Sequence, residues 1–158
     1  MERENMEDKE IKIIQNTTKE LLDLLNIKAD LKIAKQENDK GADIALDTED
    51  GGIVIGYHGD MLEALQLVLS LCVAKRIGRF VRISIEVGDY KKNRTDWLKN
   101  LALQTKENVL LEKREIVLPQ LKSWERRIIH LLLQEDKEVI SQSQGEGRDR
   151  VLVVSPRG

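Results

Sequence analysis

Two glycines interrupt the most apolar part of this sequence and restrict how the chain can fold there. Residues 53–72 read IVIGYHGDMLEALQLVLSLC, so Gly56 and Gly59 separate a short apolar run from a longer one. Glycine tolerates positive φ and lets the backbone of another molecule come close. A helix that begins directly after such a loop adds amide groups that favour anions. The stretch therefore predicts either a plain helix–helix turn or a loop that approaches a ligand.

Composition excludes several classes of protein. Of the 158 residues, 41% are hydrophobic and 34% are charged, which suits one ordinary domain or two small ones. The single cysteine excludes a disulfide framework, and the acidic N-terminus lacks the apolar segment of a signal peptide. The longest apolar stretch, at 61–74, is too short to span a bilayer. We therefore expect a cytoplasmic protein without membrane insertion.

Charge is distributed unevenly along the chain, although the formal net charge is only -2. Residues 1–89 hold 12 basic and 18 acidic side chains, whereas residues 90–158 hold 14 basic and 10 acidic ones. An excess of basic residues in one part of a chain indicates that this part meets an anion.

Hydrophobic periodicity predicts the elements of the first part of the chain. Helices are expected at 10–25, in GGIVIG, and from Asp60 to about Gly78; strands are expected in ADLKIAKQEN, GADIALDTED and FVRISIEVGD. The spacing of Asp60 and Glu63 is typical of a helix start, with Asp60 as the cap and Glu63 reaching back. This order predicts an α+β unit with one three-stranded sheet that three helices cover on one face.

The second part of the chain begins with a long charged helix at 90–114. A strand in REIVLPQL, a helix that starts on Ser123 as its cap residue, and a hairpin of VISQSQ with DRVLVVS are expected after it. This order predicts a small α/β domain with a three-stranded sheet. We expect a disordered N-terminus at 1–7, a first domain at 8–89, and a second domain at 90–158 that starts with the linking helix.

The predicted helix at Ser123 carries a strip of hydrogen-bond donors. At about 100° per residue, one broad side is apolar and the remaining arc is polar. The apolar side holds Trp124, Ile128, Ile129, Leu131, Leu132 and Leu133, and the polar arc holds Arg126, Arg127, His130 and Gln134. Arg126 and His130 are four residues apart, so both can reach one phosphate. A solvated helix face with an incidental histidine is the alternative.

The motifs and their order resemble a known family. The first unit with its IVIGYHG loop resembles a type II KH domain, in which a GXXG loop joins two helices and lies along single-stranded nucleotides. The stretch ERRIIH resembles the signature of the R3H domain, a small module that binds single-stranded nucleic acid. KH followed by R3H, with VGDYKKNR and WERRIIHLLLQ, resembles the C-terminal two thirds of the bacterial Jag (KhpB-like) family.

The resemblance implies which residues bind RNA. The GXXG loop corresponds to Gly56, Tyr57, His58 and Gly59, and the R3H contacts correspond to Arg126, Arg127 and His130. Jag-like loops tend to read Gly-Lys-Arg-Gly, whereas this loop holds Tyr57 and His58 with Asp60 behind them. We therefore expect the KH half to bind weakly and to use backbone N–H groups more than charge.

Further residues are candidates by position. Ile53, Ile55 and Leu62 are candidates for the floor of a KH groove, although core packing explains them equally well. A basic track toward the R3H helix would comprise Lys75, Arg76, Arg79, Arg82, Lys91, Lys92 and Arg94. Each of these is otherwise a solvated charge.

The resemblance implies a post-transcriptional regulator that binds single-stranded RNA, linked to cell elongation and division or to sporulation. A homodimer, or a heteromer with a small KH protein, is the implied assembly. Single-stranded DNA is an alternative to RNA as the ligand, because Arg-x-x-x-His modules need not discriminate sugars. The alternative is an interaction scaffold that uses the KH fold for docking with little RNA binding. No Cys/His ligand set, nucleophile motif or nucleotide fingerprint occurs in the sequence, so we expect neither an enzyme nor a cofactor or metal.

Overall fold

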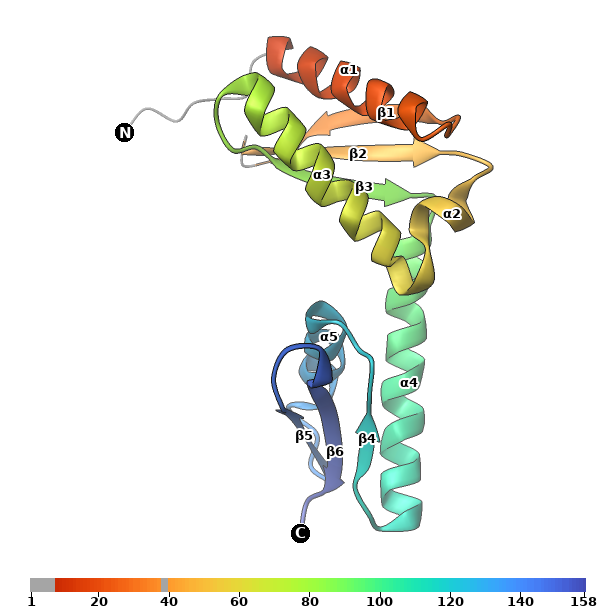
Figure 1. Ribbon diagram of the computed structural model, residues 1–158. Helices are drawn as coiled ribbons and strands as arrows, with labels where there is room; N and C mark the ends of the chain where they lie inside the picture. Colours follow the sequence, from red (N-terminus) through yellow and green to blue (C-terminus); the bar gives the residue numbers. More distant parts are fainter. Residues whose placement is uncertain (1–7, 38–39) are drawn as a thin grey trace. The chain divides into compact units, whose positions relative to one another are not determined.

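The computed structural model describes residues 8–37 and 40–158. The predicted disordered segment at 1–7 lies outside these residues. The chain divides into two units between Lys91 and Lys92, and each unit has its own sheet (Figure 1). The expected α+β fold with two three-stranded sheets is confirmed, while the domain limits 8–89 and 90–158 stay a prediction.

The first unit contains the predicted elements in the predicted order. They are α1 (Asp8–Leu24), β1 (Asp30–Lys35), β2 (Gly41–Asp47), α2 (Gly51–Ile55), a single 3-10 turn (Tyr57–Gly59), α3 (Asp60–Ile77) and β3 (Arg82–Val87). The last helix ends at Gly78, whose φ of 89° is readily adopted by glycine. Its start differs from the prediction, because Gly59 is the cap residue and Asp60 is already the first helical residue.

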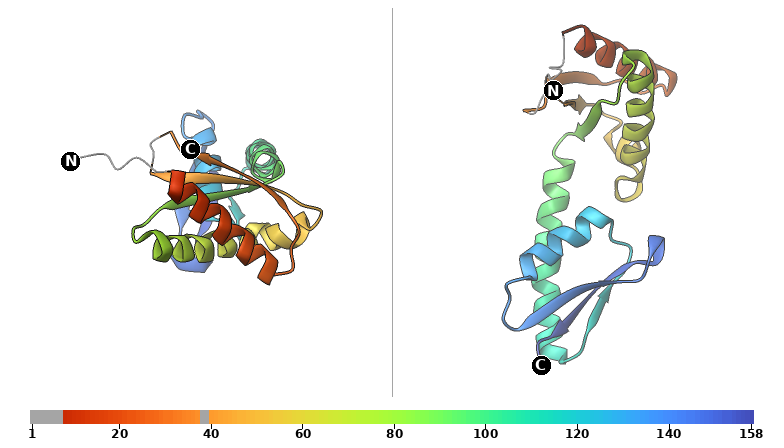
Figure 2. Two further views of the ribbon diagram at one scale, coloured as in Figure 1. Left: turned by 90° about the horizontal axis from the view of Figure 1, so that it is seen from above. Right: turned by 90° about the vertical axis from the view of Figure 1, so that its left-hand side faces the viewer.

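The sheet of the first unit has the order β1-β2-β3, with β1 antiparallel to β2 and β2 parallel to β3. Ile33 pairs with Ile44, and Ile44 pairs with Ile85, so alternate residues of each strand share one face. That face lies under α1 and α3, as Figure 2 shows, and Ile44 and Ile85 are fully buried there. The other face carries the polar residues of the alternation.

Helix α3 is apolar on more than the side that it buries. Leu62, Leu65, Leu69 and Val73 fill the core, at spacings of three and four residues. On the opposite side Leu67 and Leu71 are 61% and 62% exposed. Periodicity alone therefore could not tell which of its two apolar sides faces the sheet.

The second unit also follows the predicted order. It comprises α4 (Tyr90–Glu112), whose first two residues belong to the first unit, then β4 (Ile116–Leu118), α5 (Ser123–Leu133), β5 (Val139–Gln144) and β6 (Val151–Pro156). The antiparallel sheet has the order β4-β6-β5, and α4 and α5 share a buried core with it. The predicted hairpin of β5 and β6 is confirmed.

A buried ion pair joins α4 to the start of α5 within the second unit. Arg94 donates from Nε to Glu125 Oε1 at 2.6 Å, and the Glu125 side chain is fully buried. The second carboxylate oxygen of Glu125 accepts the backbone N–H of Lys122 at 2.9 Å, which closes the first turn of α5. The cap residue is thus Lys122, and the prediction that Ser123 caps this helix is wrong by one position.

Candidate nucleic-acid interface

The glycine loop has a backbone that only glycine adopts readily. Gly56 has φ 67° and ψ −165°, a region that is essentially closed to other residues. A Cβ atom on Gly56 would lie 2.6 Å from the Cβ of Met61. The first glycine therefore sets both the direction of the chain and its close approach to α3.

The second glycine rests on a residue far ahead in the sequence. Gly59 has φ 79°, and a Cβ atom there would lie 2.9 Å from the Tyr90 Oη and 3.2 Å from its Cε1. Tyr90 is the first residue of α4 and packs against the core of the first unit. The Tyr90 ring therefore packs against the loop at Gly59, a contact that the sequence prediction missed.

Both middle residues of the loop carry rings, of which that of Tyr57 is exposed to solvent and that of His58 is half-buried. Tyr57 is 71% exposed, and its ring meets the His58 ring edge to face with 4.1 Å between the centroids. His58 has φ 49°, a left-handed conformation that histidine adopts more often than most residues. An exposed ring beside a glycine loop is a surface on which a base can stack.

The electrostatics of the loop are less favourable for RNA than its shape. The N–H groups of Gly59 and Asp60 already donate to the carbonyls of Gly56 and Tyr57. Asp60 and Glu63 place two carboxylates in the first turn of α3, where the helix dipole would otherwise attract an anion. The loop therefore offers stacking and close approach more than positive charge.

The three floor candidates separate in the structure. Ile53 is 66% exposed on α2, whereas Leu62 is 4% exposed and belongs to the core. Ile55 is partly buried against that core. Of the three, Ile53 has the most exposed surface, whereas Leu62 follows the alternative of core packing.

Most residues of the predicted basic track already have acidic partners. Arg76 pairs with Glu20, and this hydrogen bond lowers the pKa of Glu20 below its usual value. Arg79 pairs with Glu10, and Lys91 pairs with Glu86. Arg94 is 12% exposed and is held by Glu125 and by the ring of Trp97, 4.2 Å away. A basic track needs cations that are free to bind phosphate, whereas these three arginines and Lys91 are paired with carboxylates of their own chain.

Three members of the track do remain available. Among the residues that the structure describes, Lys75, Arg82 and Lys92 have no carboxylate partner, and all three are exposed. Lys75 and Arg82 belong to the first unit and Lys92 to the second. Their contact with RNA stays a prediction.

Arg126 does not lie on the exposed strip of α5. The residue is only 8% exposed, and its guanidinium donates to the carbonyl of Leu121 and to the hydroxyl of Ser123. The helical wheel had placed it at the edge of the polar arc, and the loop before α5 covers that edge. Arg126 is therefore less accessible to a phosphate than His130, and its contact with RNA stays a prediction.

Arg127 and His130 carry the exposed donors of α5, together with Gln134. Within the described residues, no carboxylate pairs with Arg127 or His130, so their donors are not neutralised. His130 Nδ1 lies 2.8 Å from the hydroxyl of Ser141 on β5, which anchors one nitrogen of the ring. Nε2 is then the ring nitrogen left for a ligand.

Part of the predicted apolar side of α5 also faces solvent. Ile129 and Leu133 are buried in the core, but Leu131 and Leu132 are 52% and 48% exposed. The apolar side predicted for this helix is therefore only partly buried. Leu131 lies about 40° from Arg127 around the helix, so an apolar residue borders the donor strip.

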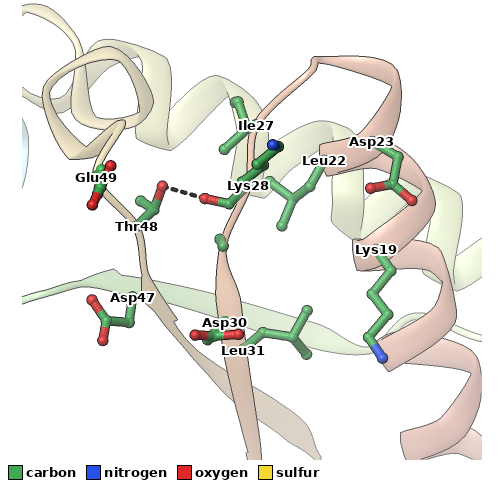
Figure 3. A pocket seen from close by; sticks show the side chains of 11 residues that line it. Lys19, Leu22, Asp23, Ile27, Lys28, Asp30, Leu31, Asp47, Thr48 and Glu49 are labelled. Atoms are coloured by element: carbon green, nitrogen blue, oxygen red, sulfur yellow. Dashed lines mark hydrogen bonds between the residues drawn. The ribbon is translucent and has the colours of Figure 1, made fainter.

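A pocket of about 560 Å³ lies where β1 begins and β2 ends, and the glycine loop does not line it (Figure 3). Four carboxylates line it against two lysines: Asp23, Asp30, Asp47 and Glu49, with Lys19 and Lys28. Asp30 and Asp47 stand directly opposite each other on paired strands. This excess of negative charge argues against a phosphate ligand here. Nowhere in 8–37 or 40–158 do three or more acidic, His or Cys residues group as metal ligands.

Comparison with known proteins bears on both units. The chain matches the family of KhpA/KhpB KH domains over residues 11–85 and the R3H domain family over residues 96–156. Among the described residues, no helix has the length and apolar character needed to cross a bilayer.

Three curated relatives illustrate the likeness. The chain is 32% identical to the RNA-binding protein KhpB of Clostridium symbiosum, over 97% of this chain and 67% of that protein. It is 31% identical to the RNA-binding protein KhpB of Streptococcus pneumoniae serotype 2, over 85% of this chain and 40% of that protein. It is 30% identical to the RNA-binding protein KhpB of Bacillus subtilis, over 78% of this chain and 60% of that protein.

Proposed function

Because this chain belongs to the KhpB family, we propose that it binds single-stranded RNA and acts as a post-transcriptional regulator. The observation that carries the proposal is the pair of exposed, unneutralised donors on α5, Arg127 and His130. They lie in the unit with the excess of basic residues. Phosphate contacts by such donors supply most of the affinity of proteins for nucleic acid.

The glycine loop contributes the second contact in this proposal. Tyr57 stacks on a base, and the glycines let the RNA backbone approach α3. Since Asp60 and Glu63 oppose phosphate at this point, the loop adds orientation and base contact, and the R3H helix adds charge. The family resemblance extends the proposal to a role in cell elongation and division or in sporulation.

Replacing Arg127 and His130 together by alanine is expected to weaken RNA binding about 10–100-fold, because a charge-assisted hydrogen bond contributes about 1.5–3 kcal/mol. The measurement is fluorescence anisotropy of a labelled single-stranded RNA, titrated at several NaCl concentrations. The dependence of log affinity on log salt should become less steep by about 0.7 for each phosphate that the variant no longer neutralises.

The matched control for this measurement is Lys99→Ala. Lys99 is an exposed basic residue of the same unit, and its side chain pairs with Asp96. We expect it to change neither affinity nor salt dependence appreciably. An unchanged salt titration in the double variant would remove the R3H helix from the RNA interface. Competition with an unlabelled DNA of equal length and sequence shows whether the site distinguishes the two sugars.

A second function, docking to another KH protein, is favoured by the exposed side of α3. Ala64, Leu67, Val68, Leu71 and Cys72 follow one another at helical spacing and are all exposed. Contiguous apolar surface of this kind marks interaction sites. We propose a second copy or a small KH protein as the partner, which accords with the assembly that the resemblance implies.

The Leu67→Glu and Leu71→Glu double variant tests docking through α3. Light scattering after size exclusion should show a dimer for the wild type, with or without RNA, and a monomer for the variant, since two buried charges oppose association. Leu103→Glu on α4 is the control, because this leucine is equally exposed but belongs to the second unit. If the wild type is a monomer by itself and does not associate with a small KH protein, α3 is not a docking surface.

A further inference from the structure

One polar side chain on the inner face of the second sheet contacts the donor strip of α5. Ser141 is only 6% exposed, and in β5 it follows the fully buried Val139 on the face that packs against the core. Its partner in β6 is Val154, which is also fully buried. The Ser141 hydroxyl lies 2.8 Å from His130 Nδ1. A buried hydroxyl among valines therefore meets the imidazole of an exposed residue of α5.

The direction of this hydrogen bond decides where the imidazole carries its proton. If Nδ1–H donated to Ser141, the hydroxyl proton would need another acceptor, and the described part of the chain offers the side chain no second hydrogen bond. A buried donor without an acceptor is unfavourable. If the hydroxyl donates to an unprotonated Nδ1, both groups are satisfied. The neutral ring then carries its proton on Nε2.

We propose that Ser141 is a positioning residue for RNA binding that holds His130 in its Nε2–H tautomer. The neutral imidazole then presents one N–H donor to a phosphate oxygen, beside the guanidinium of Arg127. The contact with RNA does not require the imidazolium form. This inference rests on the function proposed above for α5, and its first test is made on the free protein.

The tautomer is measured by long-range ¹H–¹⁵N correlation of the imidazole nitrogens at about pH 8, a pH that favours the neutral form of imidazole in general. The chain holds two histidines. His58→Gln removes the second ring and makes the assignment unambiguous. We expect an unprotonated Nδ1 and a protonated Nε2 in the wild type. Ser141→Ala should shift the signals toward a mixture of tautomers, and Ser141→Thr should restore the wild-type pattern. A protonated Nδ1 in the wild type would overturn the assignment.

RNA binding by substituted proteins gives an independent measure. A glutamine at position 130 places its amide near the site of Nε2, whereas an asparagine places it near Nδ1. His130→Gln should therefore keep affinity within about twofold of the wild type, and His130→Asn should weaken binding about 2–10-fold, the effect of one neutral hydrogen bond. Ser141→Ala should weaken binding by a similar factor, and Ser141→Thr should restore it. Equal effects of the glutamine and asparagine variants would contradict the role of Nε2.

Ser143→Ala is the matched control, because Ser143 follows on the same face of β5 and is less buried. We expect no change in the His130 signals or in affinity. The two proposals fail separately. A wild type with the Nε2–H tautomer that binds no RNA refutes the proposed function of α5, and an RNA-binding wild type with the Nδ1–H tautomer refutes the role of Ser141.

Discussion

Glu125→Leu is expected to destabilise the second unit by about 3–5 kcal/mol, the usual effect of removing one partner of a buried ion pair. The carboxylate is fully buried and serves two donors, the Arg94 guanidinium and the backbone N–H of Lys122. Leucine has a similar volume but accepts no hydrogen bond. The substitution leaves Arg94, which is 12% exposed, without its counter-charge, and it opens the first turn of α5.

Urea unfolding followed by tryptophan fluorescence measures the stability of the second unit. The chain has two tryptophans, Trp97 and Trp124, and both belong to the second unit. The unfolding midpoint is the quantity to compare, because Arg94 lies over the ring of Trp97 and its release changes the intensity of the signal. The midpoint should fall in proportion to the decrease in stability while the slope stays constant.

Two further variants separate charge burial from packing. Glu112→Gln removes a solvent-exposed partner of Arg114 and should change stability by less than about 1 kcal/mol. Combining Glu125→Leu with Arg94→Met removes both buried charges and should recover part of the stability. Recovery stays incomplete because the N–H of Lys122 still lacks its acceptor. A midpoint for Glu125→Leu equal to that of Glu112→Gln would show that the pair contributes nothing.

Gly56→Ala is expected to destabilise the first unit and to disorder the glycine loop. The backbone conformation alone costs about 1–3 kcal/mol for a residue with a side chain, and the new Cβ would meet the Cβ of Met61 at 2.6 Å. Both atoms belong to or adjoin the backbone, so neither can move away by a simple rotation. The start of α3 must shift, and the RNA contact at Tyr57 should weaken with it.

Gly52→Ala is the matched control in the same short segment. Gly52 lies inside α2, no atom would lie within 4 Å of a new Cβ, and alanine is the better helix former. This change should stabilise the unit by about 0.5–1 kcal/mol. Hydrogen exchange measured on peptides from α1 and α3 reports the first unit, which has no tryptophan. Protection in Gly56→Ala equal to that in Gly52→Ala would refute the steric argument.

Much of the fold follows from local pattern. Alternating residues predicted β3 correctly because Ile83 and Ile85 point to one face of the sheet and Arg82 and Ser84 to the other. The glycine loop and the helix end at Gly78 were predictable because positive φ is a property of a single residue. The same reasoning gave the order of elements in both units and the two motifs that the family comparisons later matched.

The chemistry of the candidate site depends on contacts that the local pattern does not contain. A helical wheel placed Arg126 beside His130, but it carries no information about the loop that covers Arg126. Both sides of α3 are apolar, so only packing decided that Leu69 is buried and Leu67 exposed.

The sequence by itself thus determined the order of the helices, strands and glycine turns and where each lies to within a few residues, because these depend on neighbouring residues. Only the tertiary structure decided which charges are free. Arg94 meets Glu125 across 31 positions, and His130 meets Ser141 across 11. Whether a guanidinium binds a carboxylate of its own chain or a phosphate of RNA is settled by burial and by distance in space, and neither quantity is a property of a short stretch of sequence.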